Sequence, residues 1–125
     1  MGVLATIVWI GSSKKDHVSF PPPVRTAMGY GLYEAQLGDL TDKAKPLKGF
    51  KGAGVVEIME DHDGDTYRAV YTVRFRGYVF VLHAFQKKSK SGIAAPKRDV
   101  ELIHKRLADA ATLLRELSRK DDSDR

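Results

Sequence analysis

The group of residues in this 125-residue sequence that could do chemistry is cationic. The stretch from Arg68 to Arg98 contains arginines and lysines but no Asp or Glu, and Lys43–Lys51 contains four lysines and no acid. Arginine can hold a phosphate through two parallel hydrogen bonds, and lysine adds a point charge. Aromatic rings beside such cations can stack on an unpaired base. We therefore expect an RNA-binding or phosphate-binding surface made of Lys48, Lys51, Arg68, Arg74, Phe85, Lys87, Lys88 and Lys90.

Such a surface could bind RNA only, or it could also cut it. RNA carries its own nucleophile, the 2′-hydroxyl, so an enzyme must align it with the phosphate, neutralise developing charge and move two protons. A lysine or His83 would need a pKa near neutrality to act as the base. The alternative is structural: Arg68 and Arg74 could pair with Glu57 or Glu60 at the rim of a sheet, and His83 could be a hydrogen-bonded core histidine.

Two β-prone runs carry most of these residues. Thr66–Phe75 and Tyr78–Phe85 are rich in Tyr, Val, Phe and Thr and flank a turn at Arg76-Gly77, which predicts a hairpin at the centre of a sheet. Side-chain alternation places Arg68 and Arg74 on one face of the first strand. On the second strand it predicts that one face carries Val79, Val81, His83, Phe85 and Lys87.

Two further strands are predicted on either side of a helical region. Leu4–Ile10 is a short apolar run typical of a strand buried on both faces. Val55–Glu60 is a second strand, and Asp63-Gly64 after it is a strong hairpin signal. The intervening Gly38–Gly54 is polar and punctuated by glycine, so we expect a loop there.

Three helices complete the expected fold. They span Lys14–Phe20, about Val24 to Leu37, and Pro96 to about Lys120, where Lys97, Arg98, Lys105 and Arg106 should face solvent. The order β-α-α-β-β-β-α predicts one α+β domain over residues 1–120. Its small, mostly antiparallel sheet would carry a helical hairpin on one face and a C-terminal helix, followed by a disordered tail at residues 121–125.

Composition excludes several classes of function. Lys plus Arg number 21 against 16 Asp plus Glu, a net charge of +5 that suits a phosphate-rich partner. The chain has no cysteine, so it has neither a disulfide framework nor a thiolate metal site. No apolar run is long enough to span a membrane. We expect no metal and no cofactor, because no ligand spacing, paired carboxylates or phosphate-binding loop is present.

Several motifs together resemble the HigB-type branch of the RelE/ParE toxin superfamily, a group of phage-derived HigB-like proteins. They are the run Tyr67–Val73 (YRAVYTV), the string Val81–Ser89 (VLHAFQKKS) with Pro96 and a helix after it, and the loop Ala44–Gly49 (AKPLKG) after a helix pair. The resemblance covers roughly Ile7 to Leu117. It implies the compact RelE fold.

The resemblance also implies a function. Family members are typically toxins of type II toxin–antitoxin systems that cleave mRNA on the ribosome by 2′-hydroxyl attack, without metal, leaving a 2′,3′-cyclic phosphate. Arg68 matches the family arginine that contacts the scissile phosphate, and Lys88 falls at a second catalytic cation position with Lys87 beside it. The implied partners are a HigA-like helix-turn-helix antitoxin, the ribosome and mRNA. The implied location is the cytoplasm, with no membrane contact and with DNA reached only through the antitoxin.

The chain departs from the family at two places, which leaves other functions open. RelE-like enzymes often carry basic residues where this chain has Glu57 and Met59, and a tyrosine used by some members has no counterpart in Gly92–Ala95. One alternative is a ParE-like inhibitor of DNA gyrase that has no enzymatic activity. Another is a degenerate toxin that retains only antitoxin binding.

Overall fold

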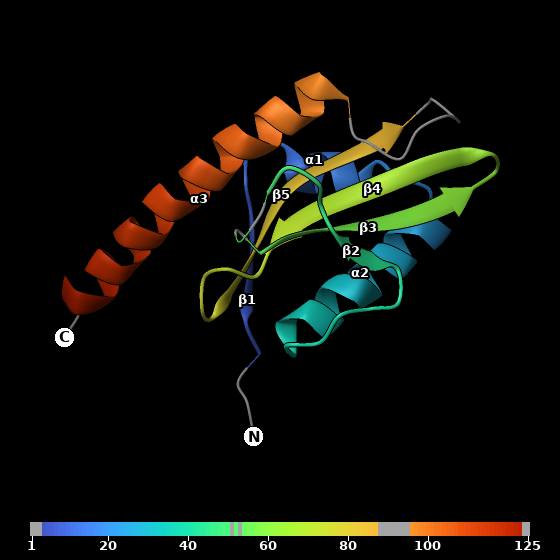
Figure 1. Cartoon of the computed structure of the whole chain (residues 1–125). Helices are drawn as coiled ribbons and strands as arrows, with labels where there is room; N and C mark the ends of the chain where they lie inside the picture. The colour runs from blue at the N-terminus through green and yellow to red at the C-terminus, as the bar shows by residue number, and fades with distance from the viewer. Residues whose placement is uncertain (1–3, 51, 53, 88–95, 124–125) are drawn as a thin grey trace.

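The computed structural model of the chain describes residues 4–50, 52, 54–87 and 96–123 (Figure 1). Its elements confirm the predicted α+β order and add one short strand. In chain order they are β1 (Thr6–Trp9), α1 (Ser13–Val18), α2 (Pro22–Gln36), β2 (Ala44–Pro46), β3 (Val55–His62), β4 (Asp65–Thr72), β5 (Tyr78–Lys87) and α3 (Lys97–Ser123). None of the helices in these ranges is long and apolar enough to cross a membrane.

The strands form one sheet in the order β1-β5-β4-β3-β2. β1 runs parallel to β5, and the other neighbouring pairs are antiparallel. The expectation that Leu4–Ile10 is buried on both faces is wrong, because β1 lies at the sheet edge with Thr6 exposed and its other residues half-buried. The expectation of a loop throughout Gly38–Gly54 is also wrong, since β2 pairs with β3 there. Pro46 is compatible with that position because β2 is an edge strand.

Turn chemistry determines where the long strands begin and end. Asp63 and Gly64 both have positive φ, 50° and 84°, as the tight hairpin between β3 and β4 requires. β4 ends at Thr72 rather than at Phe75, and the next residue, Val73, donates its backbone N–H to the carbonyl of Gly54. The predicted hairpin at Asp63-Gly64 is therefore confirmed, whereas the predicted end of β4 was three residues too late.

A bulge in β5 changes which side chains share a face. Val70 pairs with His83 and Tyr71 with Val81, so Leu82 is an extra residue in the register. Val79 and Val81 consequently pack in the core cluster under α2. Beyond the bulge, Phe85 packs in the cluster on the α3 side. The prediction that Val79, Val81, His83, Phe85 and Lys87 share one face is wrong for this reason.

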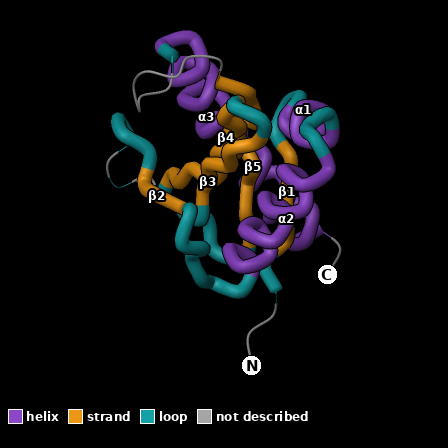
Figure 2. Tube along the Cα trace, turned by 90° about the vertical axis from the view of Figure 1, so that its right-hand side faces the viewer, coloured by secondary structure: helices purple, strands orange, loops and turns teal. Residues whose placement is uncertain are grey.

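Helices cover both faces of the sheet, as Figure 2 shows from the side. On one face, α2 packs the apolar stripe of Val24, Met28, Leu32 and Ala35 against β3, β4 and β5. On the other, Ile103 and Ala110 of α3 pack against Val70, Phe80 and Leu82. The loop after β2 joins this second layer through Phe50, whose ring stacks on His104 with centroids 4.0 Å apart. The face under α3 is the one that carries Arg68.

Two glycines of α2 provide a matched test of this packing. A Cβ on exposed Gly29 meets nothing within 4 Å, whereas a Cβ on buried Gly31 would lie 2.8 Å from Ile58 Cδ1 and 3.2 Å from Thr41 Cγ2. We expect Gly29→Ala to raise the free energy of unfolding by about 0.5–1 kcal/mol, through helix propensity alone. Gly31→Ala should instead lose stability, because overpacking costs about 1–3 kcal/mol. Urea denaturation of both variants measures this, and equal stabilisation by both would contradict the tight α2–β3 contact.

Candidate functional site

A buried ion pair lies at the centre of the predicted cationic group. Arg68 on β4 is 1% exposed, and its Nη1 donates to Oε2 of Glu57 on β3 at 3.1 Å. Glu57 is itself 7% exposed. The register sets Met59 opposite Arg68 and Val70 opposite Glu57, so both charged side chains project from the α3 face of the sheet. Burial raises the pKa of Glu57, and the charge and hydrogen bond of Arg68 oppose that rise.

Lys87 brings a second buried cation to this face from the third strand. It pairs with Thr66, two residues from Arg68 on β4, and is 7% exposed. Burial lowers the pKa of Lys87, as does the charge of Arg68, whereas Glu57 raises it. Exposed Lys45 pairs with Glu57 in the β2–β3 register and also acts on that carboxylate. We call Glu57, Arg68 and Lys87 the charged triad.

His83 lies beside the triad in a hydrogen-bonded network. Its Nε2 is 2.8 Å from Asp99 Oδ1, and its Nδ1 is 3.4 Å from Nη1 of Arg106. The ring is 6% exposed and stacks on half-buried Phe85, with centroids 4.6 Å apart. With both ring nitrogens engaged by α3 residues, His83 joins that helix to β5.

The expectation that Arg106 faces solvent is wrong. This side chain is 9% exposed and donates from Nη1 to the carbonyl of Leu82 at 2.9 Å and from Nη2 to Ser12 Oγ at 3.1 Å. The bulge explains its position, because Leu82 is the extra residue of β5 and its carbonyl bonds to the guanidinium. Arg106 therefore links the start of α1, the bulge and α3.

The remaining predicted residues do not all meet at the triad. Arg74 is exposed two residues beyond the end of β4, and its guanidinium lies over the ring of Phe75. Lys48 is exposed and comes two residues after Pro46, which is the register partner of Val56 near the start of β3. Lys87, by contrast, pairs with Thr66 at the beginning of β4. Arg74 and Lys48 thus lie toward the opposite end of the sheet from Lys87. Lys51, Lys88 and Lys90 lie outside the described residues.

Glu57 is not among the site residues predicted from the sequence. There it is a departure from the basic pattern of the family and a candidate structural partner for Arg68. The structure supports the pairing and places the carboxylate within the triad. A usable signal was present, because an acidic residue within a strongly apolar strand needs a cationic partner. Within the described ranges, no group of His, Asp or Glu is arranged to hold a metal ion.

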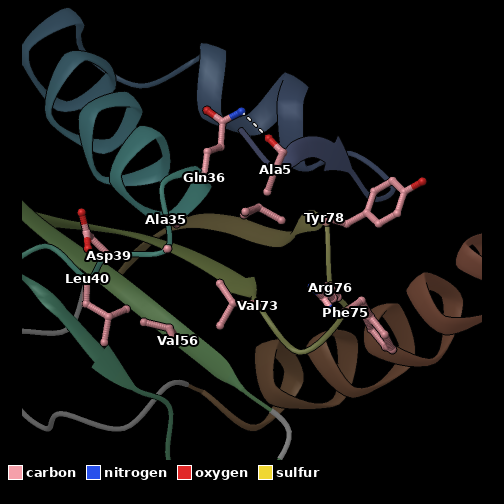
Figure 3. A pocket seen from close by; sticks show the side chains of 13 residues that line it. Ala5, Ala35, Gln36, Asp39, Leu40, Val56, Val73, Phe75, Arg76 and Tyr78 are labelled. Carbon is pink, nitrogen blue, oxygen red and sulfur yellow. Dashed lines mark hydrogen bonds between the residues drawn. The ribbon is translucent and has the colours of Figure 1, made fainter. Parts of the chain in front are cut away.

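Two of the cavities in the described part of the chain lie near the ends of the central strands, outside the triad. One, of about 670 Å³, has Tyr67, Phe85, Gln86 and Arg98 in its lining and runs along β5 beyond the end of β1. The other, of about 390 Å³, lies between the end of α2 and the β4–β5 connection (Figure 3). There the side chain of Gln36 donates to the carbonyl of Ala5 at 2.7 Å. The first cavity adjoins His83 and Phe85, whereas the second contains none of the predicted site residues.

The network predicts that Arg106→Met lowers the free energy of unfolding by about 1–3 kcal/mol. The substitution keeps an aliphatic side chain but leaves the Leu82 carbonyl and Ser12 without their guanidinium donor. Lys105→Met is the matched control, since this neighbour is 73% exposed and pairs only with Asp109 within the described structure. The control should change stability by less than about 0.5 kcal/mol. Equal losses in thermal or urea denaturation would contradict the assigned role of Arg106.

Comparison with known proteins identifies the family to which the chain belongs. No curated protein matches the chain. Among solved structures, it is similar to a chain in the crystal structure of the toxin–antitoxin complex RelBE2 from Mycobacterium tuberculosis. The identity is 18% and the TM-score is 0.48, with coverage of 71% of this chain and 98% of that chain. Residues 15–108, about three quarters of the sequence, match the family model described as Phage derived protein Gp49-like (DUF891). The chain therefore belongs to the Gp49-like family of phage-derived proteins.

Proposed function

We propose that this protein is the toxin of a type II toxin–antitoxin system and an endoribonuclease that cleaves mRNA on the ribosome. Support comes from the HigB-like strings Tyr67–Val73 and Val81–Ser89. The observation that carries the proposal is the charged triad, in which Arg68 and Lys87 from adjacent strands are buried on one face. Two cations in a low-dielectric site stabilise a phosphorane-like transition state far better than exposed cations would.

Each predicted residue has a role in this proposal. Arg68 holds the scissile phosphate, and Lys88 supplies a second charge to it with Lys87 beside it. Phe85 stacks on an unpaired RNA nucleobase, or it supports the His83 ring, on which it stacks in the structure. His83 has both ring nitrogens engaged by α3 residues, so its proposed role is to hold α3 against β5. Lys48, Lys51, Arg74 and Lys90 contact the RNA backbone away from the cleaved bond.

The proposal requires the triad to become accessible to RNA. Arg68, Glu57 and Lys87 are 1%, 7% and 7% exposed, so a phosphate reaches them only after part of the surrounding structure moves. We propose that this movement accompanies substrate binding on the ribosome, because the new contacts between the phosphate and the cations offset the free-energy cost of the movement. This requirement fits an enzyme that depends on the ribosome and is inactive on free RNA.

The proposed partners follow from the same assignment. They are a HigA-like helix-turn-helix antitoxin, the ribosome and mRNA in the cytoplasm, with DNA contacted only through the antitoxin. The net charge of +5 suits both ribosomal RNA and an acidic antitoxin surface.

One observation favours a second candidate, a ParE-like inhibitor of DNA gyrase without enzymatic activity. The guanidinium of Arg68 already bonds to the carboxylate of Glu57, as a purely structural cation would. In that case the triad stabilises the sheet, and the inhibitory surface lies elsewhere. A gyrase supercoiling assay with purified protein separates the two candidates.

Expression of the wild type in growing bacteria, with mapping of mRNA 5′ ends, tests the proposal. We expect growth arrest and new 5′ ends within translated codons. Lys87→Gln and Lys88→Ala should each reduce the new ends by about 10-fold or more, because each removes a charge that acts on the transition state. Lys14→Gln, an exposed residue of α1, is the control and should cleave normally.

Two outcomes would contradict the proposal. Arrest with intact mRNA and inhibited supercoiling would assign the gyrase function. No arrest from a folded and soluble wild type would indicate a toxin that retains only antitoxin binding. Thermal denaturation of the Lys87 and Lys88 variants confirms that any loss of cleavage is not a loss of folding.

A further inference from the structure

Glu57 is the one carboxylate in the charged triad, at a place where a phosphate-binding site has no need of negative charge. Its Oε2 accepts a hydrogen bond from Arg68 at 3.1 Å, and the charges of Lys87 and Lys45 also act on it. A carboxylate among three cations weakens the binding of an anionic substrate. A role in binding alone therefore does not account for it.

We infer that Glu57 is the general base that activates the 2′-hydroxyl of RNA and that Lys87 is the general acid that protonates the leaving 5′-oxygen. The inference rests on the proposed function, since it assigns two roles within the same cleavage reaction. It departs from the basic residues that RelE-like enzymes often carry on this strand, because a carboxylate rather than a lysine or histidine takes the proton.

The strand register supports these two roles. Glu57, Arg68 and Lys87 come from the neighbouring strands β3, β4 and β5, and all three project from the face that α3 partly covers. Arg68 is on the middle strand, with Glu57 on one side and Lys87 on the other. A phosphate held by Arg68 would then have a base on one side and an acid on the other. In-line displacement requires this arrangement, since the nucleophile and leaving oxygen lie on opposite sides of phosphorus.

The surroundings shift the pKa values of Glu57 and Lys87 toward the neutral range, from opposite sides. Burial raises the pKa of Glu57 despite Arg68, Lys87 and Lys45, which makes this carboxylate a stronger base than an exposed glutamate. Burial and Arg68 lower the pKa of Lys87 despite Glu57, which makes the ammonium a stronger acid than an exposed lysine. Two groups adjusted in these directions are suited to exchange protons with a substrate near neutral pH.

The step balances as follows. The Glu57 carboxylate removes the proton from the 2′-hydroxyl, and the 2′-oxygen forms a bond to phosphorus. The bond from phosphorus to the 5′-oxygen breaks, and the Lys87 ammonium gives that oxygen a proton. The products are a 2′,3′-cyclic phosphate and a 5′-hydroxyl. Protonated Glu57 and neutral Lys87 then return to their starting forms by net transfer of one proton through solvent.

The pH dependence of cleavage under single-turnover conditions tests the assignment. The wild-type rate should fall at low pH as Glu57 is protonated and fall at high pH as Lys87 loses its proton, giving a bell-shaped profile. Glu57→Gln should cleave about 10²–10⁴-fold more slowly and lose the acidic limb. Glu57→Asp keeps a carboxylate near Arg68, so it should keep the acidic limb even at a reduced rate.

Glu60→Gln is the matched control on the same strand. Glu60 pairs with exposed Lys43 at 2.8 Å, and the pleat places it on the opposite face of β3 from Glu57. This variant should cleave within about 3-fold of the wild type with an unchanged pH profile. Circular dichroism of each variant checks the fold. If Glu57→Gln does not fold, the acidic limb of the Glu57→Asp pH profile tests whether Glu57 is the general base.

A substrate with sulfur in place of the bridging 5′-oxygen separates the acid from the base. The thiolate leaves without a proton, so it should restore Lys87→Gln to within about 10-fold of the wild type and leave Glu57→Gln slow. A Glu57→Gln variant that keeps the wild-type profile, or a Lys87→Gln variant that sulfur does not restore, would overturn the inference while cleavage itself stands. A wild type that cleaves neither substrate on ribosomes would overturn the proposed function together with this inference.

Discussion

The ion pair between Glu57 and Arg68 is the constraint on which the candidate site depends. Two opposite charges that are 7% and 1% exposed cannot be separated without leaving an uncompensated charge in the interior, at a cost of about 3–5 kcal/mol. The pair therefore fixes where the guanidinium lies between β3 and β5. On the same face, burial and the charge of Arg68 lower the pKa of Lys87, and the charge of Glu57 opposes them.

The bulge at Leu82 is the second constraint, and it connects the triad to the rest of the fold. By inserting one residue into β5, it brings His83, Phe85 and Lys87 to the face under α3. The carbonyl of Leu82 then accepts from Arg106, and His83 meets Asp99, so α3 is held against the strand beside the triad. The position of Lys87 in the triad and the position of α3 consequently depend on the same irregularity.

Local patterns in the sequence predicted the element order well, because helix periodicity, strand propensity and the Asp63-Gly64 turn act over short distances. The misses came from long-range pairing. β2 exists because β3 provides a partner for its three residues, the bulge is invisible to simple alternation, and Arg106 is buried by acceptors from β5 and the start of α1. Within the site, the sequence indicated Arg68 and Lys87 but did not show that Glu57 shares their environment.

The most direct test of the account is cleavage of a ribosome-bound mRNA with a single 2′-deoxynucleotide immediately 5′ to the mapped scissile phosphate. The account predicts that the all-ribose mRNA is cut to a 2′,3′-cyclic phosphate and a 5′-hydroxyl, and that the deoxy-substituted mRNA stays intact at that position. Equal cleavage of both mRNAs, or a product with a 3′-hydroxyl and a 5′-phosphate, would show that water rather than the 2′-hydroxyl is the nucleophile. That result would contradict the role given to the charged triad.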